Sequence, residues 1–254
     1  MKRMALVRLD ELTYPQVRRL LDEGTDTLLW PVGTLEAHGR HSPIGTDSFC
    51  AEGIACRLGE RTGWPVAPTL GYGVTTGLVA YPGGVRIDKE LYGRLVRTIL
   101  ENFLRIGFRR VVIINGHGGN TETISAVMKE MITEDRGNRH LILIDWWQLD
   151  GPALEAVYGR KGGHAALDET ACVLAFRPEL VDPDALEPSE VTTITPGVVA
   201  APYSAAVILY EEGDSTPDFD PDKAGRFVTM VTDRIEAILA DEVEQFERSF
   251  GKKG

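Results

Sequence analysis

Residues 110–120 read RVVIINGHGGN, and this stretch decides the fold class of the chain. The first part, Arg110–Asn115, is a short run dominated by Val and Ile, which is typical of a strand buried in a parallel sheet. A glycine-rich turn with His117 at its centre follows, and a helix is expected from about Thr121 to Glu134. A strand, a tight turn and a helix in this order form the repeating unit of an α/β protein.

The same alternation continues along the chain in both directions from this stretch. Further strands are predicted at Thr27–Val32, Trp64–Leu70 and Leu141–Trp146. Helices are predicted at Ser48–Arg61, Asp88–Ile106, Asp168–Phe176 and Lys223–Phe250. Residues 178–222 are rich in Pro, Gly and acidic residues, so irregular structure with at most one short strand pair is expected there. The pattern predicts one α/β domain over residues 1–254, with a mostly parallel sheet covered on both faces.

The amino-acid composition limits which kinds of molecule the protein is expected to bind. The chain has 254 residues, of which 43% are hydrophobic and 26% charged, with a net charge of −11. Such an acidic surface repels phosphate backbones and anionic lipids, so neither nucleic acid nor a membrane surface is expected as a partner. The first fifteen residues lack the apolar segment of a signal peptide, and no apolar run approaches the roughly 18 residues that span a bilayer. A cytoplasmic location is expected.

The three cysteines are Cys50, Cys56 and Cys172. An odd number without CxxC spacing argues against a disulfide scaffold and against a cysteine-based zinc site. We predict that they are small buried hydrophobic side chains.

The segment Trp30–Asp47 (WPVGTLEAHGRHSPIGTD) carries the first group of polar candidates. Glu36 and His38 are two residues apart, so on an extended backbone both side chains point the same way. Asp47 follows at the start of a predicted helix. It could bring in a second carboxylate, or Thr46 or Asp47 could simply cap that helix.

The segment GGHAALDET, from Gly162 to Thr170, carries His164 and Glu169 in a similar setting, although Asp168 and Glu169 could merely complement the helix dipole. Three of the five histidines thus lie in glycine-flanked loops near a carboxylate. Imidazole and carboxylate ligands suit zinc, manganese or iron, and more than three of them suit a two-metal hydrolytic site. The predicted ligands are Glu36, His38, Asp47, His117 and Glu169.

A nucleotide-binding turn is the alternative explanation for the glycine-rich segment around His117. That segment has neither the GxGxxG spacing nor the GK[ST] ending of nucleotide-binding loops. A metal site is therefore favoured.

The three motifs, taken in their order and spacing, resemble the creatininase (creatinine amidohydrolase) family over nearly the whole chain. The resemblance implies a three-layer α/β/α fold with a parallel core, a binuclear site for divalent metal ions, a small-molecule substrate and a homo-oligomer, often a hexamer. It also implies that Glu36 and His117 bind one metal, that His38 and Glu169 bind the other, and that Asp47 bridges them.

The same resemblance suggests roles for residues around the metals. His164 resembles the residue that shuttles the proton during hydrolysis, so His164 and Glu169 are the predicted catalytic residues. Trp146 and Trp147 match an aromatic pair that is expected to close over the substrate, although packing at a strand end would explain them equally well. His41 and His140 are expected at the surface.

The chain departs from the family pattern near the expected substrate pocket. Creatininases proper are expected to carry a Tyr-Glu pair after the central histidine, with that Glu binding metal, whereas this chain has Gly118 and Gly119. Many members have a Ser and a His before a PGT turn, whereas this chain has Thr75 in GVTTGLVAYPGG. Gly118, Gly119 and Thr75 are therefore predicted to contact the substrate, which need not be creatinine.

Hydrolysis of a cyclic or simple amide is the expected function. Other activities within the family remain open: hydrolysis of a pyrimidine-precursor formamide, of a cofactor-precursor peptide or of an oxidised inositol ring. A phosphorylated substrate would need a basic pocket, for which Arg40, Arg86 and Arg160-Lys161 are the candidates, although each is expected to be an exposed charge. Outside the enzymes, the chain could be a protein that binds a metal or a small ligand without turnover.

Overall fold

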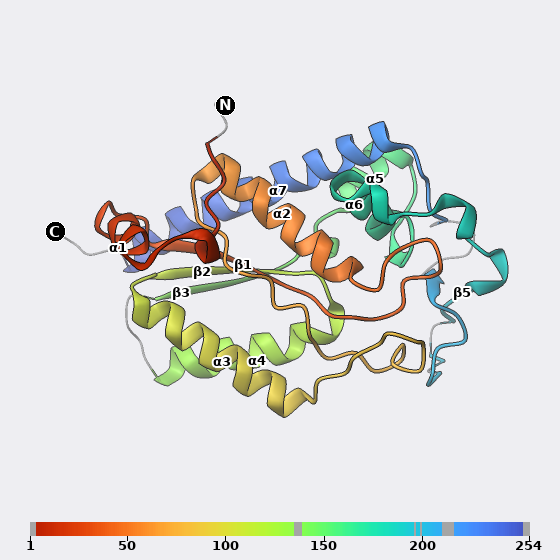
Figure 1. Ribbon diagram of the computed structural model, residues 1–254, viewed down its shortest axis with the longest axis horizontal. Coiled ribbons are helices and arrows are strands. Elements are labelled where there is room, and N and C mark those ends of the chain that lie inside the picture. The colour runs from red at the N-terminus through yellow and green to blue at the C-terminus, as the bar shows by residue number, and fades with distance from the viewer. Residues whose placement is uncertain (1–3, 135–138, 196, 199, 210–215, 251–254) are drawn as a thin grey trace.

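The computed structural model describes residues 4–134, 139–195, 197–198, 200–209 and 216–250, which form a three-layer α/β/α arrangement (Figure 1). The central layer is a parallel sheet with the strand order β1-β2-β3, made of β1 (Thr27–Val32), β2 (Arg110–Asn115) and β3 (His140–Asp145). The predicted α/β class and the parallel sheet are confirmed. The predicted single domain of residues 1–254 includes residues 1–3, 135–138 and 251–254, which lie outside the described residues.

Helices cover both faces of the sheet (Figure 1). One face carries α2 (Thr46–Thr62), α5 (Gly151–Tyr158), α6 (Leu167–Phe176) and α7 (Pro221–Phe250). The other carries α3 (Lys89–Ile106) and α4 (Gly118–Glu134). The side-chain carboxylate of Asp88 caps α3 by accepting from the N–H groups of Glu90 and Leu91. The sequence patterns did not predict α5 or the N-terminal helix α1 (Tyr14–Asp22).

The register of the three strands brings their carboxyl ends to one edge. Val32 pairs with Asn115, and Asn115 pairs with Asp145. All residues of β1 and β2 are buried, as expected for strands covered by helices on both sides. The loops that follow β1 and β2 therefore begin side by side, at the right-hand end of Figure 1.

The prediction of a strand at residues 64–70 is wrong. This segment runs beside β1 and makes only isolated parallel bridges: Val66 bridges to Leu29 and to Arg8, and Leu70 bridges to Val32. Pro65 and Pro68 have no N–H group to donate, so a continuous ladder cannot form. The segment still covers the edge of β1.

Within the predicted irregular segment, residues 178–222, the described residues form the one short strand pair that was expected, and a third short strand from outside the segment joins it. A small second sheet has the order β4-β6-β5, made of β4 (Gly163–His164), β5 (Val191–Thr193) and β6 (Val207–Leu209). β4 is antiparallel to β6, and β5 is parallel to it. Residues 196, 199 and 210–215 of this segment lie outside the described residues.

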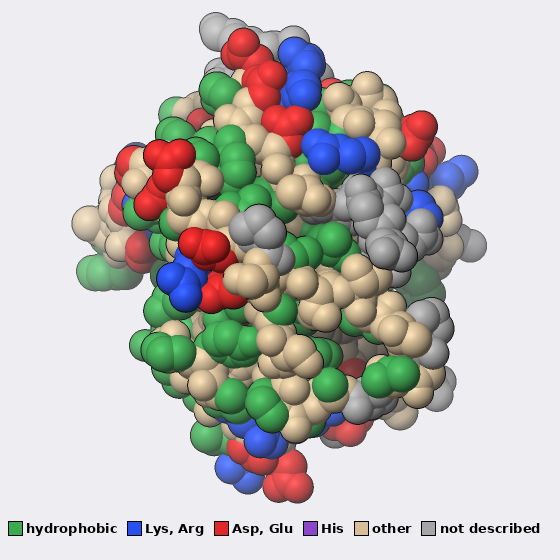
Figure 2. All heavy atoms as spheres, turned by 90° about the vertical axis from the view of Figure 1, so that its right-hand side faces the viewer, with side chains coloured by type: hydrophobic (Ala, Val, Ile, Leu, Met, Phe, Trp, Pro, Cys, Tyr) green, Lys and Arg blue, Asp and Glu red, His purple; other side chains and the backbone are tan. Residues whose placement is uncertain are grey.

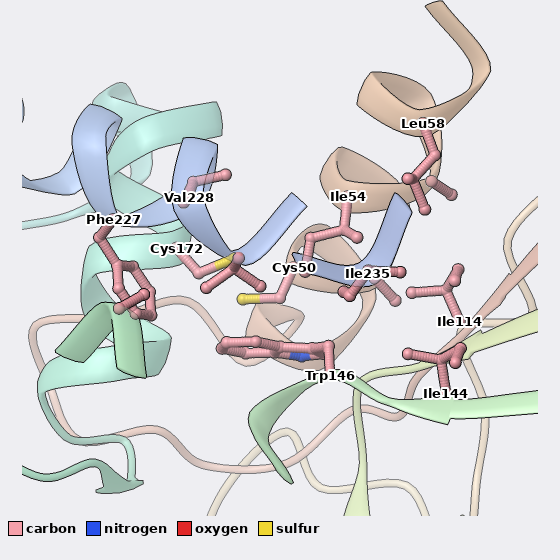
Figure 3. Close-up of a cluster of buried hydrophobic side chains, with 14 of the residues drawn as sticks. Cys50, Ile54, Leu58, Ile114, Ile144, Trp146, Cys172, Phe227, Val228 and Ile235 are labelled. Atoms are coloured by element: carbon pink, nitrogen blue, oxygen red, sulfur yellow. The ribbon is translucent and has the colours of Figure 1, made fainter. Parts of the chain in front are cut away.

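A hydrophobic cluster between the sheet and the helices α2, α6 and α7 includes Trp146 and two of the cysteines (Figure 3). Cys50 and Cys172 are buried, Cys56 is half-buried, and all three are free thiols, as predicted. None of the described helices combines the length and the apolar character that crossing a membrane requires.

His140 was expected at the surface, and this prediction is wrong. The residue begins β3 and is only 8% exposed, because its ring stacks on Phe246 of α7 with 4.0 Å between ring centroids. Its Nε2 lies 3.3 Å from a carboxylate oxygen of Glu242. The long C-terminal helix therefore covers it.

Candidate metal centre

The five predicted metal ligands converge at the carboxyl edge of the parallel sheet. Glu36 and His38 lie in the loop after β1, and His117 lies in the turn between β2 and α4. Asp47 and Glu169 lie in the first turns of α2 and α6. These side chains are buried or nearly so, and the fold brings all five predicted positions together.

Asp47 is the centre of this cluster. Its Oδ1 lies 3.0 Å from Nε2 of His38, and its Oδ2 lies 3.1 Å from Nδ1 of His117. The helix begins at Thr46 with Gly45 as its N-cap, so neither Thr46 nor Asp47 is the capping residue. The carboxylate of Asp47 is thus free of a capping role and faces two histidines, one with each oxygen.

Three histidines are oriented by backbone carbonyl groups. Nδ1 of His38 lies 3.1 Å from the carbonyl oxygen of Glu36. Nε2 of His117 lies 3.0 Å from that of Val74, and Nε2 of His164 lies 2.9 Å from that of Ala37. Because a carbonyl only accepts, the ring nitrogen beside it is the N–H donor. The other nitrogen of each ring then faces the carboxylates, which is the orientation that a metal-binding imidazole requires.

The two glutamates complete the cluster. Oε1 of Glu36 lies 3.3 Å from Nδ1 of His117, and Oε2 of Glu169 lies 3.4 Å from Nε2 of His38. Glu169 also accepts a hydrogen bond of 2.6 Å from the N–H of Ala165. Ala165 has a φ of 53°, an uncommon value for a residue with a side chain, and strain of this kind is often found at functional sites.

The electrostatics of the cluster fit a cation. Burial alone would lower the pKa of His38, but Asp47 and Glu169 raise it well above the usual value. Burial would likewise lower the pKa of His117, which Asp47 and Glu36 instead raise. Among the described residues, Nε2 of His38 and Oδ2 of Asp47 are buried, and each has a neighbour of opposite charge type at 3.0–3.1 Å but no contact with the geometry of a hydrogen bond. Divalent cations would satisfy these atoms.

The ligand atoms fall into three compact groups. Glu36, Asp47 and His117 form one, and His38, Asp47 and Glu169 form another, so Asp47 belongs to both. The third group is Glu36, His38 and His164. Within each group, the ligand atoms lie within 4.8 Å of one another, which is close enough to hold one ion.

A cavity of about 310 Å³ opens from the cluster. Its lining includes Glu36, His117, His164 and Glu169 together with three of the predicted substrate-binding residues, Gly118, Gly119 and Trp147. The sequence patterns missed the remaining wall, which comes from Val74, Thr76, Gly77, Leu78, Gly116, Gly163, Asp168, Ile194, Tyr203 and Ile208. Gly163 and Asp168 lie inside the GGHAALDET motif, from Gly162 to Thr170. No motif or hydrophobic pattern in the sequence pointed to Ile194, Tyr203 or Ile208.

Two predicted substrate contacts lie elsewhere. Trp146 is fully buried in the hydrophobic cluster of Figure 3, and only its neighbour Trp147 lines the cavity. Thr75 is 1% exposed and is not among the residues that line the cavity, whereas Thr76 is. His41, expected at the surface, is 1% exposed, and its Nε2 lies 3.0 Å from Oγ1 of Thr170. Burial lowers the pKa of His41 to about 4.

A buried cluster of histidines and carboxylates beside a cavity, at the carboxyl edge of a parallel sheet, defines an α/β protein with a candidate metal centre. The sequence model of the family described as "Creatininase: Creatinine amidohydrolase" matches residues 10–239. The chain belongs to the creatininase family.

Individual members of the family are similar over most of their length. The creatinine amidohydrolase of Pseudomonas putida is 28% identical over 231 residues, which cover 80% of this chain and 89% of that protein. The mycofactocin precursor peptide peptidase of Mycobacterium ulcerans is 28% identical over 229 residues, with 84% of each chain covered. The solved structure of "Creatininase Mn" superposes with a TM-score of 0.82 at 25% identity, covering 94% of this chain and 99% of that one.

Proposed function

We propose that this chain is a metal-dependent amidohydrolase that cleaves the C–N bond of a small amide with two divalent metal ions. One observation carries the proposal: the two carboxylate oxygens of Asp47 face His38 and His117 at 3.0 and 3.1 Å. This arrangement suits a carboxylate that bridges two ions. The similarity to a creatinine amidohydrolase supports amide hydrolysis, and the similarity to "Creatininase Mn" supports a metal site.

The ligands divide between the two ions as the two groups around Asp47 suggest. Glu36, Asp47 and His117 would hold one ion, and His38, Asp47 and Glu169 the other. These ligand types suit zinc, manganese or iron. When bound, such ions lower the pKa of a water molecule and polarise the carbonyl of the substrate.

His164 is the proposed proton carrier. Its Nε2 is held by the carbonyl of Ala37 at 2.9 Å, which leaves Nδ1 facing the cavity. Nδ1 lies 3.7 Å from Oε1 of Glu36 and 3.9 Å from Oε2 of Glu169, so it is in hydrogen-bond contact with neither. It would accept a proton from the attacking water and donate it to the leaving nitrogen. Trp147, Gly118 and Gly119 would contact the substrate.

A homo-oligomer and a cytoplasmic location remain predictions from the sequence. The same applies to the identity of the metal.

Metal content tests the site. We would measure it by plasma mass spectrometry in the purified protein and in the variants Glu36→Gln and His117→Ala. About two equivalents per chain are expected, falling in both variants. Glu122→Gln removes a carboxylate that is exposed on α4 and pairs with Lys89, so it serves as the control and should leave the metal content unchanged. A protein that takes up no metal, even after Zn²⁺ or Mn²⁺ is added, would contradict the proposal.

Turnover tests the reaction. The metal-loaded protein would be assayed on cyclic amides, formamides and short peptides. His164→Asn should keep the metal and lower kcat about 10²- to 10⁴-fold, because general acid–base catalysis contributes about that much. A metal-loaded protein that hydrolyses none of these compounds would instead be a binding protein.

A further inference from the structure

The cavity beside the metal centre has an apolar wall. Away from the cluster of histidines and carboxylates, the largest lining side chains are Val74, Leu78, Trp147, Ile194, Tyr203 and Ile208. Figure 2 looks onto this end of the molecule, where hydrophobic side chains (green) and backbone or other uncharged atoms (tan) make up much of the described surface and charged side chains form separate small groups. The wall thus suits a substrate with uncharged parts.

No Lys or Arg lines this cavity within the described ranges of the chain. Two of the four basic candidates from the sequence are engaged elsewhere: Nε of Arg40 bonds Glu190 at 2.7 Å, and Nη2 of Arg160 bonds Asp218 at 3.3 Å. The acidic side chains of Glu36, Asp168 and Glu169 do line it. Apart from the proposed metal ions, whose charge their own carboxylate ligands would largely balance, an anionic tail on the substrate would find no cationic partner here, which is costly.

A second cavity adjoins the first. It measures about 200 Å³ and shares three lining residues with the first cavity: Ile194, Tyr203 and Ile208. Its other lining side chains include Thr192, Thr193, Thr195, Val198 and Ser204, all of them uncharged. The first cavity lies at the lower end of the range of about 300–1,000 Å³ for small-molecule sites. A compact cyclic amide would leave the second cavity unused.

Tyr203 stands where the two cavities meet. Its N–H donates to the carbonyl of Gly77 at 3.2 Å, and its own carbonyl accepts from the hydroxyl of Tyr81 at 3.2 Å. A Cβ at Gly77 would overlap the ring of Tyr203, so the absence of a side chain there lets the ring lie against the backbone. The boundary between the two cavities is therefore held by specific contacts.

We propose that the substrate is an extended, uncharged amide whose scissile bond lies at the metal centre and whose tail occupies the second cavity beyond Tyr203. The proposal rests on the proposed amidohydrolase function. Water adds to the amide carbon, the C–N bond breaks, and the nitrogen leaves with a proton, so the products are a carboxylic acid and an amine. The hydroxyl group of Ser204 and that of one of the two consecutive β5 threonines, Thr192 or Thr193, would bond polar atoms of the tail.

Binding of matched hydroxamates, which chelate metal ions, tests the substrate class without requiring turnover. We would compare a short hydroxamate, the same compound with a neutral hydroxyalkyl tail, and the tailed compound ending in phosphate. On the metal-loaded protein, the neutral tail should lower Kd about tenfold, and the phosphate should abolish that gain. Equal Kd values for the short and the tailed compound, or the tightest binding by the phosphate, would overturn the proposal.

Two variants locate the tail. Ser204→Trp fills the second cavity from an exposed position and should remove the tenfold gain while leaving the short hydroxamate within twofold. Ser189→Trp alters an exposed serine that lines neither cavity, and should change neither Kd. A Ser204→Trp variant that keeps the gain would also overturn the proposal.

Three amides matched to the three hydroxamates separate the amidohydrolase proposal from the extended-substrate proposal. If the hydroxamates rank as expected but no amide is hydrolysed, the amidohydrolase function fails and the uncharged binding site remains. If amides are hydrolysed but the tail changes neither Kd nor kcat/KM, the function stands and the extended substrate is wrong. If no hydroxamate binds the metal-treated protein, both proposals fail.

Discussion

The side-chain oxygen of Asn120 accepts a hydrogen bond of 3.0 Å from the N–H of Val74, whose carbonyl lies 3.0 Å from Nε2 of His117. The amide nitrogen of Asn120 donates to the carbonyl of Gly33 at 3.1 Å. Asn120 is fully buried in the first turn of α4. One side chain thus fixes the segment that orients a candidate metal ligand.

Replacing Asn120 with Ala should weaken both the fold and the metal site. The N–H of Val74 would lose its partner in a buried place, which costs about 1–3 kcal/mol of unfolding free energy. Loss of an outer-shell partner typically lowers metal affinity about 10- to 100-fold. Urea unfolding and metal titration would measure the two effects. Asn102→Ala, on the exposed face of α3, is the control, and equal metal affinity in the two variants would contradict the prediction.

Gly119 and Gly118 should respond differently to the same substitution. A Cβ at Gly119 would overlap the carbonyl oxygen of Val74 and lie 2.5 Å from Nε2 of His117. A Cβ at Gly118 would meet only the ring of Trp147, at 3.8 Å. Gly119→Ala should therefore lower unfolding free energy by about 1–3 kcal/mol and weaken metal binding, whereas Gly118→Ala should keep both near wild type.

The pair Gly118→Ala and Gly119→Ala also tests whether a metal-binding Glu could occupy position 119, as expected in creatininases proper. The clash at Gly119 means that a side chain cannot enter without moving Val74 or His117. Wild-type metal content in Gly119→Ala would show that the backbone there can shift freely, contrary to this expectation.

The convergence of the ligands could be predicted from the sequence because parallel strands end at one edge. Val32 and Asn115 pair in register, so Glu36 and His117, placed just after them, had to lie close together. The strand at residues 64–70 was wrongly predicted because it was inferred from a run of apolar residues. Such a run says nothing about the N–H groups that Pro65 and Pro68 lack.

The sequence could not predict that one tryptophan of the pair would lie in the core and the other in the cavity. Trp146 and Trp147 lie in one 3-10 turn, where successive side chains point in different directions, so one enters the core and the other the cavity. Ile194 and Tyr203 were missed for another reason. Their positions depend on three-residue strands and on loop contacts, and neither produces a recognisable hydrophobic periodicity in the sequence.

Metal binding should release protons. In the metal-free protein, burial lowers the pKa of His38 and His117 but the surrounding carboxylates raise both well above the usual value, so both rings carry an extra proton near pH 7. The protonated rings of His38 and His117 stabilise the metal-free folded state fully below about pH 6.5, the usual histidine pKa. This stabilisation is lost as the pH rises through the raised pKa values of the folded protein. Metal affinity should accordingly rise with pH until the raised pKa values of His38 and His117 are reached.

Calorimetry in two buffers of different ionisation enthalpy would measure the protons released on metal binding. His117→Gln should reduce the number, because one of the two protonated rings is absent. Heats that do not depend on the buffer would contradict the protonated state of these histidines.

Asp150 should destabilise the metal-free protein as the pH rises. This carboxyl group is 4% exposed, its Oδ2 has no hydrogen-bond partner among the described residues, and burial with the nearby Asp168 and Glu169 raises its pKa to about 9. Between the usual value of 3.8 and about 9, the folded state holds a proton that the unfolded state has lost. Unfolding free energy therefore falls with increasing pH across that window.

Asp150→Asn keeps the shape of the side chain and removes the ionisation, so it should flatten this pH dependence. In urea unfolding with a chelator present, the variant should match the wild type near pH 4 and exceed it by several kcal/mol at pH 8.5, because one proton difference changes stability by about 1.4 kcal/mol per pH unit. Asp182→Asn, at an exposed position where the carboxylate accepts from the N–H of Asp184, is the control and should follow the wild-type curve. Parallel curves for Asp150→Asn and the wild type would show that Asp150 is already ionised in the folded protein. An ionised Asp150 would need a cationic or hydrogen-bond-donating partner, because burial and the adjacent carboxyl groups both disfavour its charge. The net charge of Asp168 and Glu169 would then also have to be less negative than two ionised carboxylates.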